Sequence, residues 1–100
     1  MAKRTNRYQI KLAQLSSSKE NAILNPEITI EIENHDEIFQ IIELVKAKKL
    51  FEEDAKAVEF ALGLKMFSEV LITNPDIAFF KSFMPAFGSF MKEMKAFNGN

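Results

Sequence analysis

The sequence predicts an α+β fold in which a two-stranded antiparallel sheet is followed by three to four helices packed on one face (β-β-α-α-α). Two segments near the N-terminus alternate between apolar and polar residues, the period of a half-buried strand. From residue 38 onward, apolar residues recur at the three- and four-residue spacing of helices. A two-stranded sheet alone is marginally stable in water, so we expect the helices to cover its isoleucine face.

The predicted strands are residues 7–13 and 28–33, separated by a polar, turn-rich loop at 16–21. The residues expected to face inward are Tyr8, Ile10 and Leu12 on the first strand and Ile28, Ile30 and Ile32 on the second. The outward residues carry opposite charges on the two strands. If the strands pair antiparallel, Lys11 and an opposed Glu31 or Glu33 would complement each other.

A first helix is expected after the second strand. Asn34 can cap it, and Glu37 three residues later occupies the capping-box position. The helix continues through Val45 and finishes on basic residues, which suit the negative end of the helix dipole. These residues are Lys46, Lys48 and Lys49.

The central helix covers about residues 53–72, and its apolar arc is wide enough to indicate packing on more than one side. Gly63 lies mid-helix, where glycine costs about 1 kcal/mol relative to alanine. We expect close approach of another backbone there; the alternative is a kink that opens a ligand cavity. Asn74 should end this helix and cap the next one, with Pro75 at the first helical position.

The C-terminal segment carries a seam of apolar residues at alternating three- and four-residue spacing. Its members are Phe80, Phe83, Phe87, Phe90, Met94 and Phe97. Pro85 lies inside the seam and disfavours helix for the residue before it. The sequence therefore predicts two helical pieces, roughly residues 75–83 and 86–97.

The length of 100 residues predicts one domain, 1–100, with a core at about 7–97 and frayed ends at 1–6 and 98–100. There are no cysteines, and no apolar run approaches the ~20 residues of a membrane span, so we expect a cytoplasmic protein. Charge is uneven: residues 1–19 sum to +5 and residues 20–59 to −7. A basic strand beside an acidic one explains this. A basic arm for a nucleic-acid backbone is the less favoured alternative, and no nucleic-acid partner is expected.

The candidate reactive groups favour structural roles. His35 adjoins Asp36, but a metal site normally needs three or four converging ligands, so we expect a capping or exposed histidine. A nucleophilic pair of Ser68 with Lys65 would need a pocket and an oxyanion hole. A serine bonded to its own helix and an i,i+4 ion pair from Lys65 to Glu69 are simpler. We therefore expect no catalytic residue, no metal, no cofactor and no enzymatic activity.

The phenylalanine- and methionine-rich C-terminal segment is the one functional lead. The candidate interaction surface is Phe80, Phe83, Phe87, Phe90, Met91, Met94 and Phe97. Core packing explains part of it, but the arc is wider than one interface would hide, and exposed apolar patches mark partner surfaces. The hypothesis is a non-enzymatic protein-interaction module that either forms a homodimer or binds an unidentified protein partner. The alternative is a binder of a small hydrophobic ligand in a Phe/Met-lined pocket. Pairing through a strand edge is a second route to a dimer.

Short motifs along the chain resemble a known family. They are Tyr8-x-Ile10, Glu33-Asn-His-Asp36, Leu62-Gly-Leu-Lys-x-Phe-Ser-Glu-Val70, Pro85-x-Phe87 and Phe90-Met-Lys92. Together they are similar to a group of small bacterial proteins catalogued as a domain of unknown function, over about residues 7–95. The resemblance implies a compact bacterial domain and supplies no activity, ligand or catalytic residue.

Overall fold

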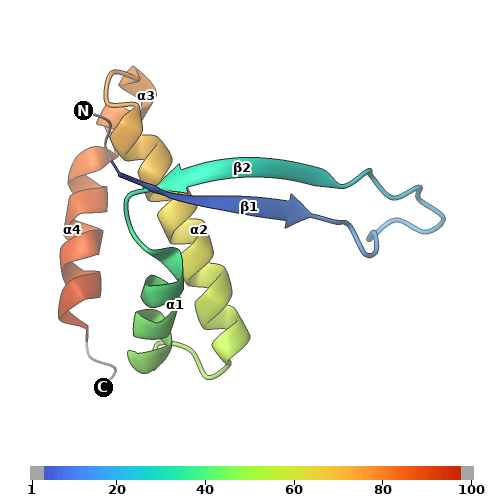
Figure 1. Ribbon diagram of the computed structural model, residues 1–100, viewed down its shortest axis with the longest axis horizontal. Helices are drawn as coiled ribbons and strands as arrows, with labels where there is room; N and C mark the ends of the chain where they lie inside the picture. The colour runs from blue at the N-terminus through green and yellow to red at the C-terminus, as the bar shows by residue number, and fades with distance from the viewer. Residues whose placement is uncertain (1–3, 98–100) are drawn as a thin grey trace. The chain divides into compact units, whose positions relative to one another are not determined.

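Two antiparallel strands open the chain. In the computed structural model, which describes residues 4–97, β1 spans Asn6–Leu12 and β2 spans Ile28–Asn34 (Figure 1). The register puts the apolar residues in three cross-strand pairs: Tyr8 with Ile32, Ile10 with Ile30, and Leu12 with Ile28. The alternation in the sequence therefore becomes one apolar face and one charged face of the hairpin, as predicted.

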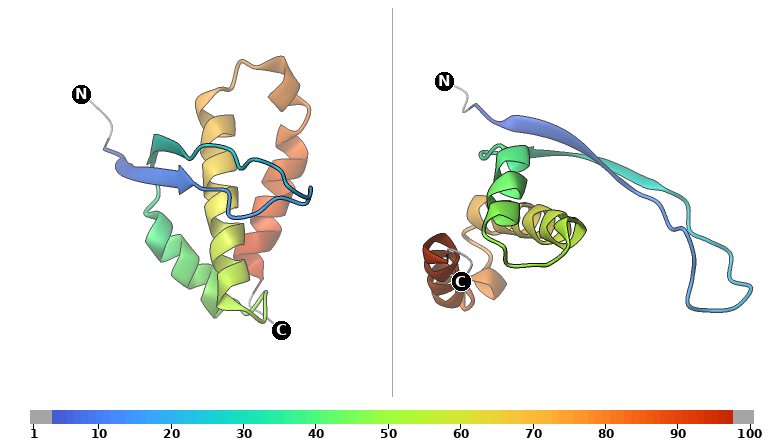
Figure 2. Two further views of the ribbon diagram at one scale, coloured as in Figure 1. Left: turned by 90° about the vertical axis from the view of Figure 1, so that its right-hand side faces the viewer. Right: turned by 90° about the horizontal axis from the view of Figure 1, so that it is seen from below.

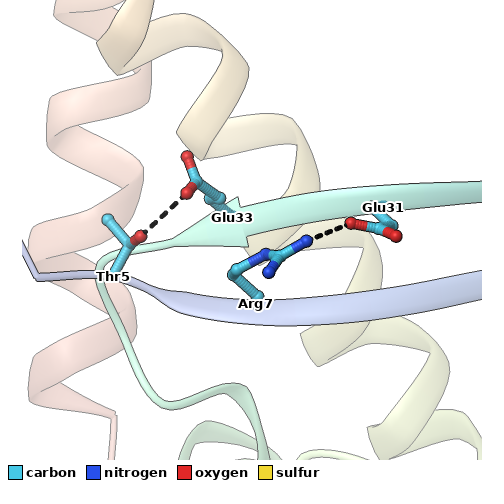
Figure 3. A network of polar contacts seen from close by, with 4 residues as sticks. All are labelled: Thr5, Arg7, Glu31 and Glu33. Atoms are coloured by element: carbon cyan, nitrogen blue, oxygen red, sulfur yellow. Dashed lines mark hydrogen bonds and ion pairs between the residues drawn. The ribbon is translucent and has the colours of Figure 1, made fainter.

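On the charged face, basic residues of β1 lie beside acidic residues of β2. This confirms the prediction that a basic strand beside an acidic one explains the uneven charge along the chain. Arg7 lies opposite Glu33 and forms an ion pair with Glu31, its diagonal neighbour (Figure 3). Thr5 Oγ1 donates a hydrogen bond of 3.2 Å to Glu33 Oε1. The predicted placement of a glutamate directly opposite Lys11 is wrong. The register that aligns the apolar pairs puts Thr29 there.

The loop between the strands is tied together by its own side chains. Gln14 Oε1 accepts two hydrogen bonds of 2.8 Å from Asn25, one from the backbone N–H and one from Nδ2. Asn21 takes the left-handed conformation with φ of 58°, which asparagine adopts more readily than most residues. The predicted loop at 16–21 lies within this connection.

The chain divides into two compact units, Met1–His35 and Asp36–Asn100, and each is described by itself. The single domain of 1–100 stays a prediction. The predicted frayed residues 1–3 and 98–100 lie outside the described residues, whereas Asn6 already belongs to β1.

Helix α1 spans Ile38–Ala47 and opens the helical unit. Its N-cap is Glu37, whose side chain accepts a hydrogen bond of 2.9 Å from the backbone N–H of Phe39. The predicted cap at Asn34 is therefore wrong, because Asn34 is the last residue of β2 and pairs with Asn6. The predicted basic end is present: Lys46 lies in the last turn, and Lys48 is the C-cap.

Helix α2 spans Asp54–Thr73, within a residue of the predicted bounds, and packs on α1. Val45 of α1 and Ala57 and Ala61 of α2 form a buried cluster at this contact. Partly buried side chains surround the cluster: Ile41, Ile42, Phe51, Phe60 and Met94. Alanines at the contact let the two helices approach closely, and the cluster of Val45, Ala57 and Ala61 forms the core at this contact.

The end of α2 differs from the prediction in one respect. Asn74 is the C-cap, and its Nδ2 donates a hydrogen bond of 2.8 Å to the carbonyl of Val70. The next helix, α3, begins only at Ala78, with Ile77 as its N-cap. The prediction that Asn74 caps the next helix with Pro75 as its first residue is therefore wrong. The Asn74 side-chain amide is used to cap the C-terminal end of α2, and Pro75 lies in the turn that follows.

The predicted break in the C-terminal segment is present, although its position differs. Helix α3 spans Ala78–Lys81 and α4 spans Met84–Ala96. Pro85 lies in the first turn of α4, where no intrahelical donor is required, instead of preceding the helix. Helices α2 and α4 run in opposite directions, with α3 in the turn between them (Figures 1 and 2).

An ion pair fastens the segment before α1 to the middle of α2. Lys65 Nζ pairs with Asp36 Oδ2, and the Lys65 side chain is only 12% exposed. An ion pair between Lys65 and Glu69 stays a prediction. Ser68 is buried, and its Oγ donates a hydrogen bond of 3.3 Å to the carbonyl of Lys65. The prediction of a serine bonded to its own helix is thus confirmed.

The predicted close approach at Gly63 is wrong. A Cβ built at Gly63 would meet nothing within 4 Å, since α1 packs on a different side of α2, through Ala57 and Ala61. Gly63 is exposed and lines an open apolar groove with Phe60 and Leu64 among others.

Replacing Gly63 by alanine should therefore stabilise the protein. We expect Gly63→Ala to raise the free energy of unfolding by up to about 1 kcal/mol, because a methyl group fits without contact and helix propensity improves. Urea denaturation followed by circular dichroism measures this. Gly88→Ala on α4, which also meets nothing within 4 Å, is the matched control and should behave alike. A loss of stability at Gly63 alone would contradict the open environment.

Removing the carboxylate from Asp36 should destabilise the helical unit. We expect Asp36→Asn to lower the free energy of unfolding by about 1–2 kcal/mol, because the largely buried Lys65 ammonium loses that carboxylate. The control is Glu43→Gln, which breaks the surface pair with Lys46 and should change stability by about 0.5 kcal/mol or less. Equal effects of the two substitutions would show that burial of Lys65 has no energetic consequence.

Candidate functional site

The seven candidate residues of the C-terminal segment divide between core and surface. Phe87 is buried, and Met94 packs against the cluster of Val45, Ala57 and Ala61. Phe80 and Met91 are half-buried. The exposed members are Phe83, Phe90 and Phe97. Phe90 lies on α4, whereas Phe83 is its N-cap and Phe97 its C-cap, and we call these three residues the exposed line of α4. Partner binding by this line stays a prediction.

An aromatic cluster attaches the start of α4 to α2. The Phe67 ring centroid lies 5.9 Å from that of Phe83 and 6.5 Å from that of Phe87. The Phe83 and Phe87 rings are 5.9 Å apart. These separations fall in the favourable range for tilted and edge-to-face pairs. Part of the phenylalanine excess in the sequence therefore stabilises the helical unit.

The apolar face of the hairpin is exposed at one end. Exposed fractions are 65% for Leu12, 56% for Ile28 and 44% for Ile30, whereas their neighbours Tyr8, Ile10 and Ile32 are intermediate. Three further apolar side chains are exposed in the loop: Leu15, Ile23 and Leu24. The prediction that the isoleucine face is covered is wrong for Ile28 and Ile30, which are exposed. A signal was available in Leu15, Ile23 and Leu24, which place apolar residues in an otherwise polar loop.

The remaining candidate groups do not converge. His35 is exposed, and within residues 4–97 no three His, Cys, Asp or Glu side chains gather where they could hold a metal ion. Ser68 and Lys65 are engaged as described above. No helix within the same range is both long and apolar enough to cross a membrane.

A cavity of about 450 Å³ lies among α1, α2 and α4. Its apolar lining is Ile41, Leu44, Val45, Leu64, Met91 and Met94, and its charged lining is Asp36, Lys48, Lys65 and Lys95. Two of the seven candidate residues, Met91 and Met94, thus line this cavity, which has no phenylalanine in its lining. Phe80 and Phe83 line a smaller pocket of about 290 Å³ together with Phe67. The lysines come from three separate parts of the chain: Lys48 is the C-cap of α1, Lys65 lies on α2 and Lys95 lies on α4. Their convergence therefore has no signal in the linear sequence.

The comparisons with known proteins give a fold and a family. The crystal structure of a protein of unknown function from Pectobacterium atrosepticum SCRI1043 is similar, with a TM-score of 0.78 and 27% identity over 93% of this chain and 99% of that one. No curated protein matches the chain. A family model described as a domain of unknown function with a solved structure matches residues 6–96. The predicted α+β fold and the resemblance to an uncharacterised family are confirmed, and the chain belongs to this family, DUF3861.

Proposed function

We propose that the protein is a non-enzymatic interaction module that self-associates, with a second copy of the chain covering the apolar face of the hairpin. The observation that carries the proposal is the exposure of Leu12, Ile28 and Ile30 on that face. An isolated two-stranded hairpin is marginally stable in water and needs further strands or a packed layer on its apolar face. A second hairpin supplies such a layer.

The charges on the hairpin favour one mode of self-association over another. The charged side chains of β1 are both basic, Arg7 and Lys11, and those of β2 are both acidic, Glu31 and Glu33. Twofold pairing through an edge would bring β1 beside β1 or β2 beside β2, and therefore like charges together. Pairing β1 of one copy with β2 of another would avoid this, but it leaves an edge free and produces an open chain of molecules.

Stacking of two hairpins through their apolar faces avoids both difficulties. All four charged residues lie on the opposite face, because they alternate with the apolar residues along each strand. The twofold axis would lie between the two hairpins, at right angles to their strands, next to the Ile10–Ile30 pair. It would put the Tyr8–Ile32 pair of one copy over the Leu12–Ile28 pair of the other. The contact then contains apolar and aromatic side chains only, and it closes at two copies.

The non-enzymatic part of the proposal is supported by the engagement of the groups that could react. The Ser68 hydroxyl donates to a carbonyl of its own helix, and the Lys65 ammonium pairs with Asp36. Neither group is positioned as a nucleophile with a neighbouring base.

Sedimentation velocity across micromolar concentrations tests the proposal. We expect a dimer for the unaltered chain and at least a tenfold weaker dimer for Ile30→Lys, because a charge enters the centre of the apolar contact. Thr29→Lys is the matched control: it introduces the same charge one residue away on the opposite face, so the dimer should persist. Circular dichroism of each variant verifies that it folds.

Two results would contradict the proposal in different ways. A monomer at every concentration would refute self-association itself. A dimer that survives Ile30→Lys but dissociates with Phe90→Lys would transfer the interface to the exposed line of α4.

A further inference from the structure

We infer that the cavity among α1, α2 and α4 binds a small amphipathic anion, an apolar chain that carries one carboxylate or similar acidic group. The cavity volume of about 450 Å³ lies within the range of roughly 300–1,000 Å³ that is typical of small-molecule sites. This inference is independent of self-association, because no hairpin residue lines the cavity.

The lining determines the apolar part of the ligand. α1 and α2 supply rigid aliphatic walls, and α4 supplies Met91 and Met94. Unbranched, polarisable methionine side chains adapt to ligands of irregular shape. The four remaining apolar residues are Ile41, Leu44, Val45 and Leu64. A flexible hydrocarbon chain is the ligand body that such a wall accommodates best.

The charged lining determines the sign of the head group. Three lysines face one carboxylate, so the lining has a formal charge of +2. This excess favours an anion and disfavours a cation.

Two of the three lysines are already held in place by the protein. Lys48 Nζ donates hydrogen bonds of 2.8 Å to the carbonyl of Phe97 and 3.4 Å to that of Lys95, at the C-terminal end of α4. Lys65 is paired with Asp36. The side chain of Lys95 has no hydrogen bond or ion pair with another described residue. Lys95 is therefore the group that would bind the acidic head, with Lys48 and Lys65 adding to the local positive potential.

Nuclear magnetic resonance of the full chain labelled with ¹³C at the methionine methyl groups tests the inference. Octanoate is the probe, and 1-octanol and octylammonium are its neutral and cationic counterparts. We expect octanoate to shift the Met91 and Met94 methyl signals, with affinity at least about fivefold higher than that of octanol and no binding of octylammonium. Met66 and Met84 do not line the cavity and serve as internal controls.

Three variants locate the site. Leu44→Glu puts a carboxylate at an exposed position of the lining and should weaken octanoate binding at least tenfold. Phe39→Glu makes the same kind of change at an exposed position of α1 outside this cavity and should leave binding unchanged. Lys95→Gln should weaken octanoate binding about fivefold without altering octanol binding. If Leu44→Glu fails to fold, Lys95→Gln carries the test.

Three outcomes would overturn the inference. Absence of any Met91 or Met94 shift at millimolar octanoate would refute binding in the cavity. Equal affinities for octanoate and octanol would refute recognition of the anion. Equal weakening by Leu44→Glu and Phe39→Glu would show that octanoate binds elsewhere.

Discussion

The close contact of α1 with α2 is the constraint on which the helical unit depends. Ala57 and Ala61 are 3% and 0% exposed, and Val45 from α1 fits against them. Larger residues at the two alanines would force the helices apart, since a close-packed contact has no space for additional methylene groups. Because small residues occupy the contact, the large apolar residues of α2 lie beside it. Phe60 and Leu64 consequently line an open groove, and Leu64 also lines the cavity. The unusually wide apolar arc of α2 thus reflects a narrow core with apolar surface on its flanks.

The attachment of α4 has a different physical character. It rests on large side chains, with Phe87 against Phe67 and Met94 against the alanine cluster, and on the Lys48 ammonium at its C-terminal carbonyls. A lysine at the end of a helix satisfies carbonyls that lack intrahelical partners. Long side chains hold a helix at a greater distance than alanines do, and this distance leaves the cavity between α4 and the α1–α2 pair. The same residues that stabilise α4 therefore produce the space that we assign to a ligand.

Local patterns in the sequence predicted the strands and helices well. The errors arise where contacts with residues distant in the sequence determine the role of a residue. Strict alternation of apolar and polar residues predicted both strands and their apolar faces. The three- and four-residue spacing of apolar residues predicted the bounds of α2 to within one residue. Asn34 was predicted as a helix N-cap because asparagine often caps helices and Glu37 follows three residues later. In the structure Asn34 instead belongs to β2 and pairs with Asn6 of β1. Gly63 was predicted at a close contact, whereas the contact uses alanines on another side of the helix. The exposure of Ile28 and Ile30 and the convergence of three lysines depend on positions in space, about which spacing along the chain contains no information.

The two units offer surfaces that suit different kinds of partner, and the difference follows from how each buries its apolar residues. The hairpin has a single layer, so it cannot bury its own apolar face, which is exposed at Leu12 and Ile28, and only an object of comparable size can cover it. The helical unit has a core of its own, and the space that its helices leave is concave and bordered by charge. An exposed apolar face without charge selects for another protein surface, and a concave, partly open apolar space beside an available ammonium selects for a small anion. Since the two sets of residues do not overlap, a substitution that abolishes one interaction should leave the other intact.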